Sequence, residues 1–286
     1  MNREEKFALL GTIIAASIGL ALKFALGNSS EVSPQTFTSI VALAFGIQWL
    51  AFVPAYLLQT EHFYDLVGGT SFVLVAAYSL MLGPSIDLRS AILFTMVLLW
   101  GGRLSTFLFL RVRKAGEDSR FKEIKKSFIR FFFAWTAQGL WVTFTLAPVV
   151  VALLQPTGGV DLFLVVGVAI WLFGFGFEIT ADAQKSRFKQ DSANKGKFIQ
   201  HGLWSLSRHP NYFGEITLWT GIAIIAIPTL GGWQFLSLAS PVFIFTLLKY
   251  VSGVPMLEKR ADEKWGHLDE YQAYKKATPV LVPRLR

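Results

Sequence analysis

A short polar run between two apolar segments carries the densest set of groups suited to binding a ligand. It reads Arg-His-Pro-Asn-Tyr-Phe-Gly-Glu over residues 208–215. Pro210 fixes the entry to a helix, and the first backbone N–H groups and the dipole of a helix favour an anion. The guanidinium of Arg208 adds a group that binds phosphate. The candidate binding residues of this run are Arg208, His209, Asn211, Tyr212 and Glu215.

A second group of candidates consists of ionisable residues within or beside long apolar segments. Such residues are costly in a bilayer and are functional-site hypotheses by default. Arg103 lies inside one segment, and Glu178 and Asp182 lie one helical turn apart at the end of another. Glu61 and Asp65 come directly before a third. We therefore expect a polar layer at one end of a set of membrane-spanning helices.

The elements that position these residues are predicted to be transmembrane helices. Hydrophobic residues make up 53% of the 286-residue chain and charged residues 16%, whereas a soluble domain carries about 25% charged residues. About eight apolar stretches reach the roughly 17–25 residues that a helix needs to cross a bilayer; the third and seventh are short, which leaves seven spans as the alternative. The sequence predicts an all-α polytopic transmembrane bundle without a β-sheet. The stretches are residues 7–26, 37–58, 66–82, 91–110, 128–154, 162–181, 212–228 and 235–254.

The distribution of Lys and Arg among the loops predicts the orientation. With eight spans, the N-terminus, the basic stretches 111–130 and 182–211, and the basic tail fall on one side, and the other side keeps only Arg89. The positive-inside rule places both termini and the basic loops in the cytoplasm, and we expect a bacterial inner membrane. The net charge of +8 is then explained by topology and by contact with membrane lipids, so no nucleic-acid partner is expected.

Several kinds of site are excluded or not expected. Cysteine is absent, which excludes disulfides and thiolate chemistry. No metal site is expected, because His201 and His209 have no further ligand set beside them. The specific motifs begin after the second apolar stretch, so residues 1–58 are predicted to form N-terminal spans and residues 59–286 the functional membrane domain.

The motifs together resemble a known family. The run 208–215, the Glu-Ile-Thr-Ala-Asp segment 178–182 and the tail motifs Glu-Lys-Arg and Asp-Glu-Tyr are similar to those of the steroid 5-alpha reductase-like integral membrane proteins. The bacterial branch of unknown function also shows a Gly-Glu-Asp-x-Arg loop, present here at 116–120. The resemblance covers about residues 59–283 and implies hydride transfer from NADPH to the conjugated C=C of an enone in a steroid-like or other lipid. The carbonyl oxygen would be polarised by nearby acids.

The resemblance also implies roles for individual residues. The catalytic acid would be Glu61 or Asp65, because the Gln-Glu pair of the reductases is split here as Gln59-Thr60-Glu61. A second departure is Trp100, which stands where the reductases have a catalytic Tyr and cannot act as an acid. Tyr64 and Tyr78 are the possible substitutes, and the identity of the lipid stays open. The cofactor-binding residues would be Arg103, Glu178, Asp182, Arg208, His209, Asn211, Tyr212, Glu215 and Arg260.

Two other functions remain open from the sequence. Isoprenylcysteine and phospholipid methyltransferases, which bind S-adenosylmethionine, share the Arg-His-Pro-x-Tyr segment and an acidic residue matched by Glu258. A transporter or lipid-binding membrane protein is the alternative without catalysis, and broken helices or inverted repeats would favour it. The expected partners are a lipid-soluble small molecule and membrane lipids. The sequence does not indicate an oligomeric state.

Overall fold

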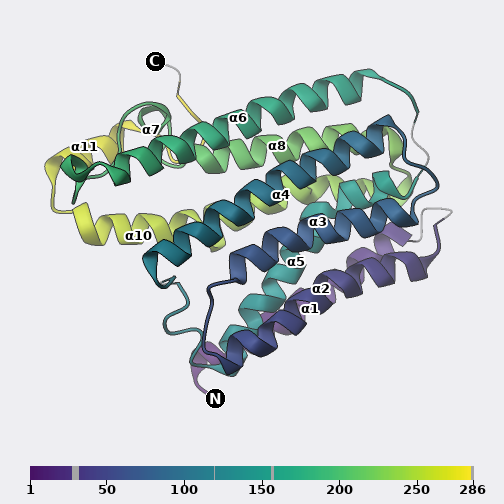
Figure 1. Ribbon diagram of the computed structural model, residues 1–286, viewed down its shortest axis with the longest axis horizontal. Coiled ribbons are helices and arrows are strands. Elements are labelled where there is room, and N and C mark those ends of the chain that lie inside the picture. Colours follow the sequence, from purple (N-terminus) through teal and green to yellow (C-terminus); the bar gives the residue numbers. More distant parts are fainter. Residues whose placement is uncertain (28–31, 119, 156–157, 285–286) are drawn as a thin grey trace. The chain divides into compact units, whose positions relative to one another are not determined.

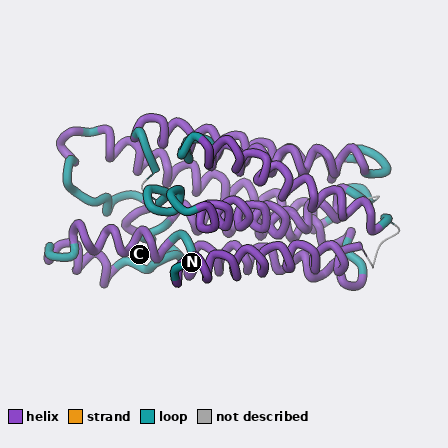
Figure 2. The backbone as a smooth tube through the Cα atoms, turned by 90° about the horizontal axis from the view of Figure 1, so that it is seen from below, coloured by secondary structure: helices purple, strands orange, loops and turns teal. Residues whose placement is uncertain are grey.

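The computed structural model describes residues 1–27, 32–118, 120–155 and 158–284, and these residues form helices and loops without a strand (Figures 1 and 2). Among them are eight helical runs long and apolar enough to cross a membrane. The predicted all-α fold is therefore confirmed, with eight candidate spans among the described residues, and the chain is an integral multi-pass membrane protein.

The helices follow one another with short connections (Figure 1). The α-helices are α1 (Arg3–Gly27), α2 (Pro34–Leu57), α3 (Tyr64–Leu82), α4 (Leu88–Ala115), α5 (Phe128–Leu153), α6 (Leu162–Gln190), α7 (Leu203–Leu206), α8 (Pro210–Ala226), α9 (Ser240–Thr246), α10 (Val254–Trp265) and α11 (Asp269–Ala277). Three short 3-10 helices cover Ser192–Asn194, Ile227–Thr229 and Gly232–Ala239, and a π-helical turn covers Leu247–Val251.

The chain divides into two compact units, residues 1–163 with 226–238 and residues 164–225 with 239–286. The predicted boundary after residue 58 stays a prediction.

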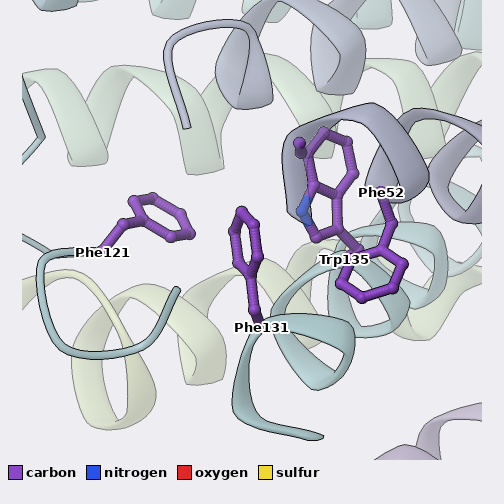
Figure 3. Packing of buried hydrophobic residues seen from close by; sticks show 5 residues of the cluster. Phe52, Phe121, Phe131 and Trp135 are labelled. Atoms are coloured by element: carbon purple, nitrogen blue, oxygen red, sulfur yellow. The ribbon is translucent and has the colours of Figure 1, made fainter. Parts of the chain in front are cut away.

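In the first unit, α5 is the central helix and packs against α1, α2 and α3, while α3 packs against α4. Its residues are apolar and buried nearly all round, as expected of a helix surrounded by other helices. At its start, Phe131 and Trp135 pack with Phe52 of α2 and with Phe121 of the loop after α4 (Figure 3). This aromatic cluster fixes the loop that carries the Gly-Glu-Asp-x-Arg motif.

Local signals explain where the helices of this unit begin. Ser33 caps α2 by accepting a hydrogen bond from the backbone N–H of Thr36, and Asp87 and Ser90 form a capping box at α4. Arg89 is only 1% exposed and pairs with Asp161 at 2.6 Å. The one Arg predicted for the non-cytoplasmic side is thus paired with an acid.

Two helical runs differ from the predicted spans. α6 continues to Gln190 instead of ending near residue 181, so Glu178 and Asp182 lie inside a 29-residue helix. The eighth run, Gly232–Trp265, changes from 3-10 to α, to π and back to α helix. Apolar composition reports where a chain can cross a membrane, and it does not report a polar helix extension or a change of helix type.

Candidate functional site

In the second unit, backbone contact between α6 and α8 gathers buried carboxylates. A Cβ atom on Gly214 would lie 2.7 Å from the backbone nitrogen of Glu178, so only glycine permits this approach. Glu178 therefore lies next to the turn of α8 that carries Glu215, and Asp182 follows one turn further along α6. All three acidic side chains are buried. The structure thus brings together three of the predicted cofactor-binding residues.

A second polar group in this unit is centred on Glu258 of α10. Its carboxylate lies 3.1 Å from Nη1 of Arg208 and 2.8 Å from Nε2 of His209. Lys275 of α11 lies 3.7 Å from the same carboxylate and 2.6 Å from that of Asp262. We call these five residues the Glu258 cluster. It joins the predicted Arg208-His209 pair to the C-terminal tail.

The hydrogen bonds of His209 define what it can offer to a ligand. Burial disfavours the imidazolium and outweighs the opposite effect of Glu258, so the pKa of His209 is lowered from its ordinary value. The ring is neutral at pH 7. Because a carboxylate only accepts hydrogen bonds, Nε2 carries the proton and donates to Glu258. Nδ1 is then an acceptor, and it is buried without a hydrogen-bond partner in the part of the chain that is described.

Arg208 offers a donor in the same place. Its Nε is buried and, within the described residues, also has no hydrogen-bond partner. The backbone N–H groups of Arg208 and His209 donate to the carbonyls of Pro279 and Val280, at 2.9 and 3.1 Å. These two amides are therefore occupied. An anion at this helix start would depend on the later amides of the first turn and on the guanidinium of Arg208.

The interrupted last span positions Glu258. After the π-helical turn, Gly253 lies so near Tyr212 that a Cβ atom would be 2.9 Å from the tyrosine ring. That ring stacks on His209, with centroids 5.6 Å apart. α10 thus starts against the beginning of α8, and Glu258 follows about one turn later. π-helical turns recur at functional sites, and this one sets the contact between Glu258 and His209.

In the first unit, the two predicted catalytic acids contact the loop after α4. Glu61 is 2% exposed, and its two oxygens accept hydrogen bonds from Lys125 Nζ at 2.7 Å and from the backbone N–H of Asp118 at 2.9 Å. Asp65 pairs with Arg120 at 3.0 Å, and Arg120 also pairs with Asp118 at 2.5 Å. These contacts tie the Gly-Glu-Asp-x-Arg loop to the start of α3; Ser119 of this loop lies outside the described residues.

The protonation of Glu61 follows from the same contacts. Burial raises the pKa of its carboxyl, but the hydrogen bonds from Lys125 and from the Asp118 amide outweigh this effect, so the pKa is lowered. Glu61 is therefore ionised at neutral pH and has little capacity to act as a general acid.

A small cavity between α3, α4 and α5 distinguishes Asp65 from Glu61 as the candidate catalytic acid. Asp65 and Trp100 line it, and Glu61 does not. Neither suggested tyrosine lines it: the hydroxyl of Tyr64 donates to the carbonyl of Ala134 at 2.9 Å, and that of Tyr78 to Ser39 at 3.1 Å. Between the two acids, this geometry favours Asp65 for contact with a bound molecule.

The remaining predicted residues are half-buried or exposed. Arg103 belongs to the first unit, is half-buried, and its guanidinium lies 5.9 Å from the ring of Phe107. Asn211 and Tyr212 are half-buried at the start of α8, and Arg260 is exposed on α10. Their roles stay predictions.

The sequence did not predict that Lys275, Lys125 and Asp118 are partners of the candidate residues. The positive-inside rule already explains lysines in basic loops, so a lysine there does not indicate a specific contact. The Gly-Glu-Asp-x-Arg motif could have indicated Asp118 and Arg120, because a fixed acid-base spacing in a loop often reflects an ion pair. Here that pair exists, and it also reaches Asp65.

Comparison with known proteins assigns the chain to a family. A family model described as "Protein of unknown function (DUF1295)" matches residues 51–278. The chain belongs to this family. The membership confirms the resemblance stated from the sequence motifs, and it leaves the activity open. No solved structure matches the chain significantly.

Characterised relatives are distant and share only part of their length with this chain. The 3-oxo-5-alpha-steroid 4-dehydrogenase 1 of Bos taurus is 28% identical over 119 residues, 42% of this chain and 41% of the relative. Steroid 5-alpha-reductase DET2 of Arabidopsis thaliana is 27% identical, over 42% and 40% of the two chains. Probable O-methyltransferase ustE of Ustilaginoidea virens is 32% identical, over 32% and 36%. The matched segments thus span about two fifths of these relatives.

Proposed function

We propose that this DUF1295 protein is a membrane-embedded, NADPH-dependent reductase that transfers a hydride to the conjugated C=C of an enone in a steroid-like or other lipid. One observation carries the proposal. Nε of Arg208 and Nδ1 of His209 are a buried donor and a buried acceptor without hydrogen-bond partners in the described chain. Leaving such groups unpaired costs about 1–3 kcal/mol each, and a bound polar ligand would recover this cost.

NADPH fits this donor set. Its phosphates would accept hydrogen bonds from Arg208 and compete with Glu258 for the guanidinium. Its ribose hydroxyl groups would donate to Nδ1 of His209 and to the carboxylates of Glu178 and Glu215. When bound, NADPH supplies the hydride, and these residues bind and orient it.

The first unit contributes the features expected of a lipid-binding part. Its cavity is lined mainly by apolar and aromatic side chains, with the carboxylate of Asp65 paired to Arg120 at one position. We propose that the substrate is drawn from the bilayer to this cavity and that the basic loops and both termini face the cytoplasm, where NADPH is available.

Ligand-induced stabilisation tests the cofactor directly. The purified protein in detergent is heated with NADPH, NADH or S-adenosylmethionine, since a ligand that binds only the folded state raises the unfolding midpoint. We expect the largest shift with NADPH, and a loss of most of that shift in Arg208→Ala and Asn211→Ala. Arg187→Ala is the matched control, because Arg187 is an exposed arginine of α6 in the same unit. Stabilisation by S-adenosylmethionine alone overturns the proposal.

Two alternatives keep specific support. The Glu258 carboxylate neutralises Arg208 and contacts His209, which suits a cationic sulfonium better than a phosphate; the O-methyltransferase relative points the same way. The interrupted last span is a feature of transporters and other binding proteins. A chain that responds to neither cofactor but is stabilised by lipids would support this last class.

A further inference from the structure

The cavity between α3, α4 and α5 contains a polar pair that the reductase proposal does not use. Most of its wall is apolar or aromatic, including Phe72, Trp100 and Trp141. Gln138 also lines it and is 3% exposed. Gln138 and Trp141 are three residues apart on α5, so both side chains are on the same helix face.

Each of these two side chains has one buried polar atom that lacks a partner. Oε1 of Gln138 and Nε1 of Trp141 make no hydrogen bond within the described part of the chain. The first atom is an acceptor and the second a donor. An apolar cavity would be more stable with hydrocarbon side chains at both positions, and a ligand that pairs with both atoms would recover this cost.

The orientation of the Gln138 amide is fixed by α3. Its Nε2 donates to the carbonyl of Tyr64 at 3.3 Å. Only an N–H group can make this bond, so the carbonyl oxygen must be the other, unpartnered atom. The amide fits there because residue 68 is glycine: a Cβ atom on Gly68 would overlap Nε2. Gly68 and Gln138 together fix the orientation of this acceptor.

We infer that this cavity binds the hydroxyl end of an apolar, lipid-soluble molecule. The hydroxyl donates to Oε1 of Gln138 and accepts from Nε1 of Trp141. A hydroxyl satisfies both atoms, whereas a ketone has no proton to donate and satisfies only the indole. The cavity has room for a group about the size of one water molecule, such as a hydroxyl, while the apolar body of the ligand lies outside it. The inference narrows the substrate class of the proposed function to lipids that carry a hydroxyl group.

The test needs no cofactor and no turnover, so its failure is distinct from failure of the reductase proposal. The full chain in detergent is titrated with 1-decanol, 2-decanone and decane, which share a chain length and differ in the head group. Trp100 and Trp141 line the cavity, so tryptophan fluorescence reports occupancy, and the unfolding midpoint reports binding independently. One extra hydrogen bond should favour decanol over decanone by roughly three- to tenfold in affinity.

Matched variants distinguish the hydrogen bonds of Gln138 and Trp141 from general effects on packing. In Gln138→Leu the preference for the alcohol over the ketone should disappear, and in Trp141→Phe both oxygen-containing probes should bind less tightly. Gln48→Leu and Trp135→Phe are the controls. Gln48 and Trp135 are fully buried residues of the same unit with an unpartnered polar atom, and neither lines the cavity.

Three results overturn the inference: equal affinity for all three probes, an alcohol preference that persists in Gln138→Leu, or an equal loss in Gln48→Leu. Equal affinity is also the result expected if the pair binds only water.

Discussion

Contact between α6 and α8 can be tested with two alanine substitutions that are two residues apart on α6. A Cβ atom on Gly174 would lie 2.5 Å from the backbone nitrogen of Leu218 and 2.7 Å from the carbonyl oxygen of Gly214. Both are backbone atoms, so Gly174→Ala must push the helices apart, which costs about 1–3 kcal/mol. A Cβ atom on Gly176 would meet nothing within 4 Å, so Gly176→Ala should stabilise α6 by about 0.5–1 kcal/mol.

The difference between the two variants isolates the cost of packing, because both gain the same helix propensity. We expect Gly174→Ala to unfold at a lower temperature than Gly176→Ala in detergent, by on the order of 5 °C. The backbone of Glu178 contacts Gly214, so Gly174→Ala should also weaken stabilisation by NADPH. Equal unfolding midpoints would show that α6 and α8 do not pack through these glycines, and the arrangement of Glu178 and Glu215 would then be wrong.

Three further predictions concern the turn between α2 and α3. Lys125→Ala leaves the carboxylate of Glu61 buried without its cation and should destabilise the protein by about 3 kcal/mol, as measured by thermal unfolding. The control is Lys126→Ala at an exposed neighbour, which should leave the unfolding midpoint unchanged. The pKa of Glu61 is lowered in the folded protein, so its contribution to stability is complete above its ordinary pKa of 4.5 and is lost as pH falls below that value. Glu61→Gln should therefore flatten the dependence of the unfolding midpoint on pH in this range. Gln59 has a φ of 49°, so Gln59→Gly should raise the unfolding free energy by roughly 0.5–1 kcal/mol, and a lowered midpoint would contradict this reading of the turn.

The membrane-spanning helices were predictable because a bilayer imposes one length and one composition on each of them. The stretches 37–58 and 128–154 agree with α2 and α5 to within three residues at each end. By contrast, α6 extends nine residues beyond its predicted end at residue 181. That extension is polar, and apolar composition contains no information about a helix that continues into water.

The candidate site was predictable only as a set of residues. Charge and spacing identified Glu178, Asp182 and Glu215, and the helix contact that brings α6 to α8 depends on Gly174 and Gly214. Glycines in an apolar helix are common, so a glycine-containing segment does not identify its partner helix. Gln138 and Trp141 were missed for another reason. They are uncharged, and their importance depends on unpaired atoms that only the three-dimensional structure reveals.

Because of the charges in the second unit, the affinities for NADPH and for S-adenosylmethionine should depend on different residues. In the Glu258 cluster, Arg208 and Lys275 are balanced by Glu258 and Asp262, and His209 is neutral. Glu178, Asp182 and Glu215 add further carboxyl groups to the buried part of this unit. A phosphate-bearing cofactor must therefore gain its affinity at Arg208, and a sulfonium would gain it from the carboxylates. Glu215→Gln should consequently weaken S-adenosylmethionine more than NADPH, and Arg208→Ala should do the reverse. If both variants weakened both cofactors equally, charge would not be the basis of selection at this site.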